Sequence, residues 1–194
     1  MSRESAKKKT NPIFYVFTNG ITEQHYYNSF KRIHRLGNVT IKIKNTSTDP
    51  KSLISYSKRY FRHERMTKKD YDKAFISFDK DDFDQKYLED IFNIADKENI
   101  GIIFSNECFE VWLLLHYKKL SKQYSRLELF KELEDATGCS NWKDNKANCV
   151  LIERIASNFE KAKSNFSSIE ENQPFKNPYF SYNTFLEVFS KRKC

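Results

Sequence analysis

Short apolar runs alternate with amphipathic stretches along residues 13–118 of the chain. Most of these runs are rich in β-branched and aromatic residues and have the length of buried strands. Residues 39–43 instead alternate apolar and polar side chains, which is typical of a partly exposed strand. We expect strands at residues 13–17, 39–43, 74–78 and 100–104. The stretches between the runs have helical periodicity, which predicts helices at residues 23–36, 50–65, 85–98 and 107–117. Strands that alternate with helices predict an α/β fold, with a mainly parallel sheet and helices on both of its faces.

Helix-capping residues support these boundaries. Thr22 is suited to cap the first helix, and Gly37 is suited to end it. Asp49 followed by Pro50 is a typical start for the second helix.

The chain after residue 118 has a different pattern, in which polar breaks separate amphipathic segments. We expect helices there near residues 125–137, 146–166 and 183–191. The sequence therefore predicts a single domain with three parts. These parts are a flexible basic tail at residues 1–12, an α/β core at residues 13–118, and a helical C-terminal elaboration at residues 119–194 that packs on the core.

Composition and charge narrow the classes of function. Hydrophobic residues make up 39% of the sequence, which excludes a disordered chain. The formal net charge of +8 favours anionic partners such as nucleic acid, although many basic proteins bind none. The four cysteines form no CxxC pair, so they indicate neither a zinc site nor a disulfide framework. Since no apolar run has membrane-spanning length and no signal peptide is recognised, we expect a cytoplasmic protein without membrane association.

Polar clusters directly follow three of the expected strands. They are residues 19–23, residues 79–82, and Ser105 and Asn106 with Glu107 and Glu110. In an open parallel sheet the ligand site lies beyond the carboxyl ends of the strands, because loops and helix N-termini converge there. If the three strands are neighbours, the clusters form one shared site.

Asp79 and Asp81 stand two positions apart after the third expected strand. Both carboxylates can turn toward one hard cation, and such oxygen ligands indicate Mg²⁺ or Mn²⁺. A cation in this place would bind a phosphate oxygen and help to orient a nucleophile for phosphodiester cleavage. The alternative is that these aspartates only end a strand and cap the next helix. An EF-hand is disfavoured, because Asp84 occupies the position that needs glycine for the sharp turn.

Gly20, Glu110 and His116 are further candidates. Gly20 permits a left-handed or a close-approach backbone at the strand end, and the following helix N-terminus can hold an anion. Glu110 stands among apolar residues, where a carboxylate is costly to bury without a cation or donors, so a functional role is favoured. His116 shares a helical face with Trp112 rather than with Glu110, which favours a structural role. A P-loop is excluded, because no glycine is followed by lysine and a hydroxyl residue at the required spacing.

Three segments in order, "TNGITEQHYY", "FISFDKDD" and "FSNECFEVWLLLHY", form a distinctive set. Together they resemble the RloB and AbiLii-like family of bacterial defence proteins, which carry a Toprim-like domain. The segment "NPYFSYNTFLEVF" is similar to the closing element of that family.

The resemblance implies roles for residues of all three segments. Asp79 and Asp81 would bind the metal, and Glu110 would be a further acid of the site. Glu23 belongs to the first loop of the site by the same resemblance. Contacts to phosphate would come from Gly20, Thr22 and Lys80, and the remaining site-lining residues would be Asp82, Ser105, Asn106 and His116.

Two positions depart from the family pattern. Asn19 stands where a Toprim domain has glutamate, and Glu107 stands where the family usually has proline. An amide offers a metal no negative charge and cannot act as a general acid or base. Three interpretations remain open. Glu23, one helical turn away, supplies the missing carboxylate; or Asn19 binds the metal through its oxygen and the chemistry is slower; or the protein is inactive.

We therefore expect a Mg²⁺- or Mn²⁺-dependent nuclease that acts as the toxic effector of an antiphage defence system. Its catalytic residues would be Glu110, Glu23 and Asn19. The family association implies an ABC-type ATPase partner, and the chain itself has no Walker motif. One alternative is a catalytically impaired nucleic-acid-binding or regulatory subunit. Another is an interaction module whose apolar helix near Trp112 docks a partner.

Overall fold

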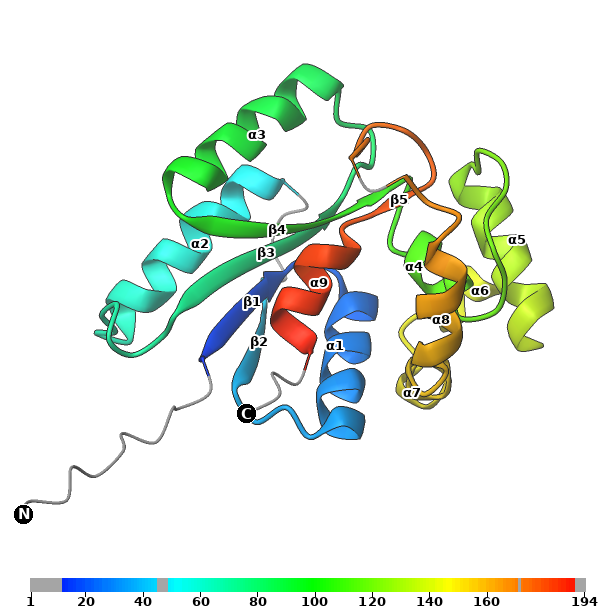
Figure 1. The fold of residues 1–194 in the computed structure, drawn as a ribbon, viewed down its shortest axis with the longest axis horizontal. Helices are drawn as coiled ribbons and strands as arrows, with labels where there is room; N and C mark the ends of the chain where they lie inside the picture. Colours follow the sequence, from blue (N-terminus) through cyan, green and yellow to red (C-terminus); the bar gives the residue numbers. More distant parts are fainter. Residues whose placement is uncertain (1–11, 45–48, 171, 191–194) are drawn as a thin grey trace, which may run out of the picture.

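The computed structural model describes residues 12–44, 49–170 and 172–190. Its strands are β1 (Phe14–Thr18), β2 (Val39–Ile43), β3 (Lys73–Asp79), β4 (Ile100–Asn106) and β5 (Tyr179–Phe180). They form one sheet in the order β2-β1-β3-β4-β5 (Figure 1). Strands β1 to β4 are parallel, and β5 pairs with β4 in the antiparallel direction. The expected mainly parallel sheet is confirmed, whereas the expected basic tail lies almost wholly outside the described residues.

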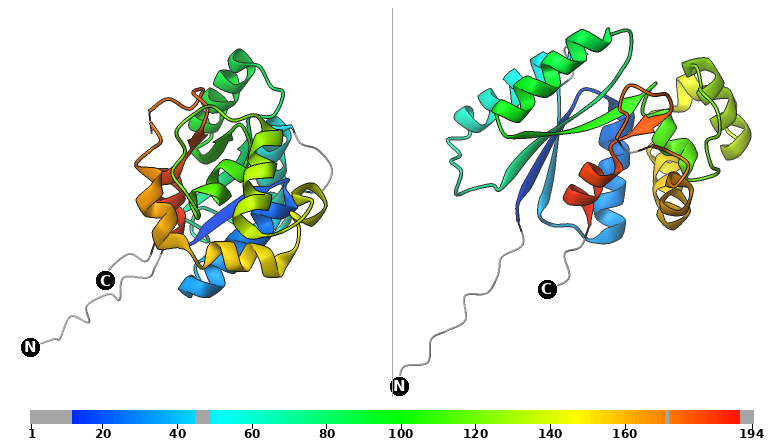
Figure 2. Two further views of the ribbon diagram at one scale, coloured as in Figure 1. Left: turned by 90° about the vertical axis from the view of Figure 1, so that its right-hand side faces the viewer. Right: turned by 45° about the horizontal axis from the view of Figure 1, so that its top comes forward.

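Helices cover both faces of the sheet, which was also expected. Four of them flank it: α1 (Ile21–His34), α2 (Pro50–His63), α3 (Gln85–Lys97) and α9 (Tyr182–Phe189). Helices α2 and α3 lie on one face, and α1 and α9 lie together on the other (Figures 1 and 2). The ring of Phe30 on α1 packs edge-on against Phe185 on α9, with centroids 5.2 Å apart. The last helix of the described chain therefore completes the core that the first helix begins.

Further helices gather at the end of the sheet where α4 leaves β4 (Figure 1). They are α4 (Glu110–Leu115), α5 (Arg126–Thr137), α6 (Trp142–Asn145), α7 (Cys149–Ala156) and α8 (Phe159–Phe166). Helix α7 packs on α1, and α4 packs on both α5 and α8. The fold is thus a Toprim-like α/β sheet with a helical C-terminal elaboration.

Two expectations about the C-terminal part were wrong. The single helix expected at residues 146–166 is split into α7 and α8, and Asn148 caps α7 by accepting a hydrogen bond from the backbone of Leu151 at 3.2 Å. The pattern also gave no sign of β5, because two residues are too few to show the alternation of a strand. This strand is defined by its partners in β4, Ser105 and Asn106.

The ends of α1 also differ from the prediction. Gly20, not Thr22, is the N-cap, and the helix begins at Ile21. The Thr22 hydroxyl donates instead to the backbone carbonyl of Lys146 at 3.2 Å, which ties α1 to the segment after α6. The helix ends at Arg35, which adopts a left-handed conformation with φ 55°, rather than at Gly37.

Helix α4 is buried along its whole length. The indole of Trp112 is stacked on Phe180, with ring centroids 4.4 Å apart. The interpretation that this apolar helix docks a partner was therefore wrong, because its side chains form the core. No helix in the described ranges is long and apolar enough to cross a membrane.

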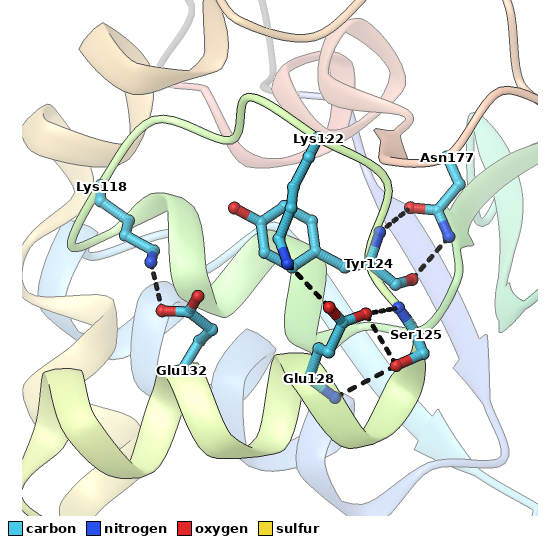
Figure 3. A network of polar contacts seen from close by, with 7 residues as sticks. All are labelled: Lys118, Lys122, Tyr124, Ser125, Glu128, Glu132 and Asn177. Atoms are coloured by element: carbon cyan, nitrogen blue, oxygen red, sulfur yellow. Dashed lines mark hydrogen bonds and ion pairs between the residues drawn. The ribbon is translucent and has the colours of Figure 1, made fainter.

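Polar contacts fix the start of α5 (Figure 3). Ser125 and Glu128 form a reciprocal capping box, in which the Ser125 backbone N–H donates to Glu128 Oε2 at 2.8 Å. The side chain of Asn177 holds the preceding residue, Tyr124, through its backbone N–H at 3.1 Å and its backbone carbonyl at 2.7 Å. These contacts set the position of Arg126, the first residue of α5.

Replacing Ser125 by alanine is expected to lower the free energy of unfolding by about 1 kcal/mol, because the first turn of α5 loses its side-chain cap. Urea denaturation followed by circular dichroism measures this change. Ser140→Ala is the matched control, since Ser140 is exposed and caps no helix. Equal midpoints for the two variants would contradict a stabilising role for the capping box.

Candidate active site

The carboxyl ends of β1, β3 and β4 lie side by side, because these strands are neighbours in the sheet. Asp79, the last residue of β3, is in register with Ser105 of β4. A cavity of about 610 Å³ opens at this edge. The predicted site residues that line it are Asn19, Gly20, Thr22, Glu23, Asp79, Asp81, Asp82 and Glu110. The fold thus brings members of all three predicted polar clusters to one cavity.

Glu23, Asp79 and Glu110 form the acidic centre of this cavity. Glu23 is 6% exposed and Glu110 is 4% exposed. Burial, with a smaller contribution from the charge of Glu110, raises the pKa of Glu23 to about 7. Burial also raises the pKa of Asp79 well above its usual range, and the charges of Glu23 and Glu110 add to this effect. The site therefore holds more carboxylate charge than its surroundings stabilise.

Hydrogen-bond donors reach only part of this acidic centre. The indole N–H of Trp142, at the start of α6, donates to Oε1 of Glu110 at 3.1 Å. The backbone N–H of Phe109 lowers the pKa of Asp79 by donating to its carboxylate. Oδ1 of Asp79 is nevertheless buried without a hydrogen-bond partner. A buried carboxylate oxygen without a donor is costly, so this atom is suited to bind a cation or a protonated ligand group.

Gly20 allows the carboxylate of Glu23 to lie against the end of β1. A Cβ atom at this position would overlap both carboxylate oxygens of Glu23. The backbone of Gly20 is extended, with φ −92° and ψ 130°, so close approach rather than an unusual conformation requires glycine here. Asn19 and Glu23 line the same cavity on either side of this glycine.

Asp81 is engaged differently from the prediction. The two aspartates were expected to turn toward one cation, but Asp81 forms an ion pair with the guanidinium of Arg126 on α5. Its backbone has a positive φ of 46°, so the chain turns sharply after Lys80. The two glutamates, Glu23 and Glu110, rather than Asp81, are the acids whose charges do most to raise the pKa of Asp79.

Four predicted residues lie outside the cavity lining: Lys80, Ser105, Asn106 and His116. The backbone carbonyl of Ser105 accepts from the Lys80 N–H at 2.8 Å, which extends the β3–β4 pairing. The side-chain amide of Asn106 donates to the carbonyl of Pro174 at 3.2 Å. These residues hold the edge of the sheet together rather than face the cavity.

His116 is part of the core below the site. Its Nδ1 donates to the carbonyl of Trp112 at 2.9 Å, so Nε2 accepts from the hydroxyl of Tyr26, also at 2.9 Å. Burial lowers the pKa of His116 to about 4. The imidazole is neutral at physiological pH, in agreement with the structural role that its helical position favoured.

Four residues that line the cavity were not among the site residues predicted from the sequence: Cys108, Arg126, Phe130 and Lys146. Burial, together with the charge of Glu110, raises the pKa of the Cys108 thiol, which therefore stays protonated. The other three come from α5 and the segment after α6. Helical periodicity indicates that such residues share a face, but it does not identify the part of the sheet that this face meets.

The donor set fits a hard divalent cation. In the part of the chain that the structure describes, no group of three or more His, Cys, Asp or Glu side chains is already arranged to hold a metal ion. Mg²⁺, however, is commonly bound by one or two carboxylates together with waters and substrate phosphates. The unpartnered Oδ1 of Asp79 and the neighbouring glutamates supply such ligands and the negative charge that a cation would offset.

Comparison with known proteins identifies the family of the chain. A family model described as RloB-like protein matches residues 14–188, which include every strand and all the residues that line the cavity. No curated protein and no solved structure matches the chain. Because the match covers most of the sequence, the chain belongs to the RloB-like protein family.

Proposed function

We propose that the protein is a Mg²⁺- or Mn²⁺-dependent nuclease that cleaves phosphodiester bonds. The observation that carries this proposal is the convergence of Glu23, Asp79 and Glu110 in one cavity, where Asp79 Oδ1 has no partner. A purely structural site would not retain three mutually repelling carboxylates, because each costs stability when it ionises. The net charge of +8 supports a polyanionic substrate.

The residues divide into two roles. Asp79 and Glu110 would hold the cation, which would polarise a phosphate oxygen and lower the pKa of a bound water. Glu23 is the proposed general base, because a carboxylate with a pKa of about 7 is about half deprotonated at neutral pH and can take a proton from water. Glu23 thereby substitutes for the glutamate that Asn19 replaces.

The direct test is cleavage of supercoiled DNA, single-stranded DNA and total tRNA in Mg²⁺ or Mn²⁺. The wild type is expected to cut at least one of these substrates, and Asp79→Asn is expected to reduce cutting to background. Asp90→Asn is the matched control, since Asp90 is exposed on α3 and away from the cavity. Cutting that survives Asp79→Asn would contradict the proposed site.

A second experiment tests the position of Glu23. Gly20→Ala is expected to slow cleavage on the order of 100-fold, because the added methyl group displaces the Glu23 carboxylate. The extended backbone accommodates alanine, so the unfolding free energy should change by less than about 1 kcal/mol. Gly37→Ala is the control, since a Cβ there meets no atom within 4 Å. Normal cleavage by Gly20→Ala would show that the placement of Glu23 is not required.

Asn19 supports a second candidate function, a regulatory subunit that binds nucleic acid without cutting it. An amide at this position of the cavity offers neither charge nor proton transfer. Wild-type protein that binds nucleic acid but cuts nothing with either metal would favour this candidate over the nuclease.

We also propose that the nuclease is the effector of an antiphage defence system and works with an ABC-type ATPase. The chain has no Walker motif, so ATP hydrolysis would have to come from another protein. Cleavage that needs both the ATPase and ATP would support this assignment. Cleavage that is equally fast without them would contradict control by such a partner.

A further inference from the structure

The outer wall of the cavity differs in chemistry from its acidic centre. It contains two aromatic side chains, Phe83 and Phe130, and two cationic ones, Arg126 and Lys146. Arg126 and Phe130 stand four positions apart on α5, so they share one face of that helix. Figure 1 shows α5 beside the end of the sheet from which α4 leaves β4. The helical elaboration therefore adds an aromatic and basic surface to a site whose carboxylates come from the α/β core and α4.

Lys146 links the cationic and aromatic groups. Its ammonium lies over the ring of Phe130, 5.9 Å from the centroid. Its charge also lowers the pKa of Glu23, so the ammonium faces the acidic centre. Among the described residues Lys146 has no ion pair with a carboxylate, whereas Arg126 is paired with Asp81. The hydrogen bond from Thr22 to its carbonyl holds the Lys146 backbone beside the first turn of α1.

Phe83, the second aromatic residue of the outer wall, lies in the turn between β3 and α3. Its ring is stacked on Tyr87 of α3, with centroids 5.3 Å apart and an interplanar angle of 29°. This support leaves Phe83 only partly buried, and one part of it lines the cavity. Partly exposed aromatic rings beside a cationic side chain without an ion pair, here Lys146, are the features by which proteins bind unstacked bases and their phosphates.

We propose that this outer wall binds single-stranded nucleic acid, with one unstacked base against Phe130 or Phe83 and an adjacent phosphate on Lys146. The inference rests on the proposed nuclease function and assigns its substrate class. The volume of about 610 Å³ lies within the range of pockets that enclose a small molecule, roughly 300 to 1,000 Å³, so it suits one nucleotide. A paired base is stacked within its helix and cannot reach these rings without being extruded.

Binding without cleavage gives the cleanest test. A fluorescein-labelled oligonucleotide, single-stranded or annealed to its complement, is titrated with the full chain in EDTA, and anisotropy reports the dissociation constant. The single strand is expected to bind more tightly than the duplex. Phe130→Ala should weaken binding of the single strand roughly 5- to 100-fold, and Phe130→Tyr should restore it, because the ring supplies the stacking surface. Leu127→Ala is the control on the same helix, since Leu127 is 78% exposed and outside the cavity.

The cation is tested separately by its effect on salt dependence. Lys146→Gln should lower the slope of log affinity against log salt by about 0.7, as expected for one lost phosphate contact with a single strand. Lys143→Gln, an exposed position of α6 outside the cavity, should leave the slope unchanged. If Phe130→Ala folds poorly, this pair still tests the proposed binding, because both replacements are polar and neither position is buried.

The outcomes separate this inference from the proposed function. Equal affinity for single strand and duplex, or unaltered binding by both Phe130→Ala and Lys146→Gln, would overturn the substrate assignment even if the wild type cuts nucleic acid. Single-strand binding that depends on Phe130 and Lys146 would support it even if no cleavage is found. Absence of binding to either form would overturn it as well.

Discussion

Glu23→Gln is expected to raise the free energy of unfolding by roughly 3 kcal/mol at pH 8 and to leave it almost unchanged at pH 4. The pKa of this carboxyl is about 7 in the folded protein, against 4.5 without burial. One pKa unit corresponds to about 1.36 kcal/mol, which gives the size of the effect. The raised pKa means that the folded state binds more protons than the unfolded state. The contribution of Glu23 is therefore most favourable below pH 4.5 and is lost as the pH rises through about 7.

Urea denaturation at pH 4, 6 and 8 measures this dependence. Glu160→Gln is the matched control, because Glu160 is exposed on α8 and its replacement should have little effect at any pH. A gain for Glu23→Gln that is the same at pH 4 and pH 8 would contradict the raised pKa. If the gain appears only at high pH, the native sequence retains a destabilising carboxylate, which is the trade-off expected of a functional site.

The fold was predictable because its elements have long, regular patterns. Strands β1, β3 and β4 are apolar runs bounded by turn residues, and β2 alternates apolar and polar residues. Asp49 marks the start of α2 as predicted, by accepting hydrogen bonds from its first turn. The sequence did not reveal β5, which has two residues and depends on pairing with Ser105 and Asn106. It also did not show where α7 and α8 divide, since the split depends on the cap at Asn148 rather than on hydrophobic periodicity.

The grouping of the residues at the strand ends was predictable for a different reason. Asn19, Glu23 and Asp79 follow the ends of neighbouring strands, so the topology of a parallel sheet places them together. The part of the site formed by the C-terminal helices depends on contacts between segments that are far apart in the sequence. Arg126 pairs with Asp81, and Trp142 donates to Glu110, but no local pattern relates these positions. The sequence therefore indicated that acids from neighbouring strands line one cavity, but neither the pairing of Asp81 with Arg126 nor the helices that enclose the acids.

The largest effect on activity is expected for Glu23→Gln, which should slow cleavage by roughly 10²- to 10⁴-fold, the usual loss when a general base is removed. Glutamine keeps the shape of the side chain but cannot accept the proton. The wild-type rate should rise with pH as Glu23 deprotonates and then level off, and because a bound cation favours the carboxylate, the rise should lie below the pKa of about 7 of the metal-free site. The variant should lose this rise while it keeps its affinity for nucleic acid. A variant with the wild-type rate and pH profile would show that Glu23 is not the base.

Asn19→Glu then decides between the remaining interpretations. Because a new carboxylate beside Glu23 adds negative charge to a buried site, it should raise the pKa of Glu23 further and shift the rise in rate to higher pH. In the double variant Asn19→Glu with Glu23→Gln the number of acids is restored, and part of the lost cleavage should return if a base at either position can serve. Recovery in the double variant would mean that Glu23 replaces the glutamate missing at position 19. If Asn19→Glu alone cuts and the wild type does not, the native site is dormant, and the protein acts by binding rather than by cleavage.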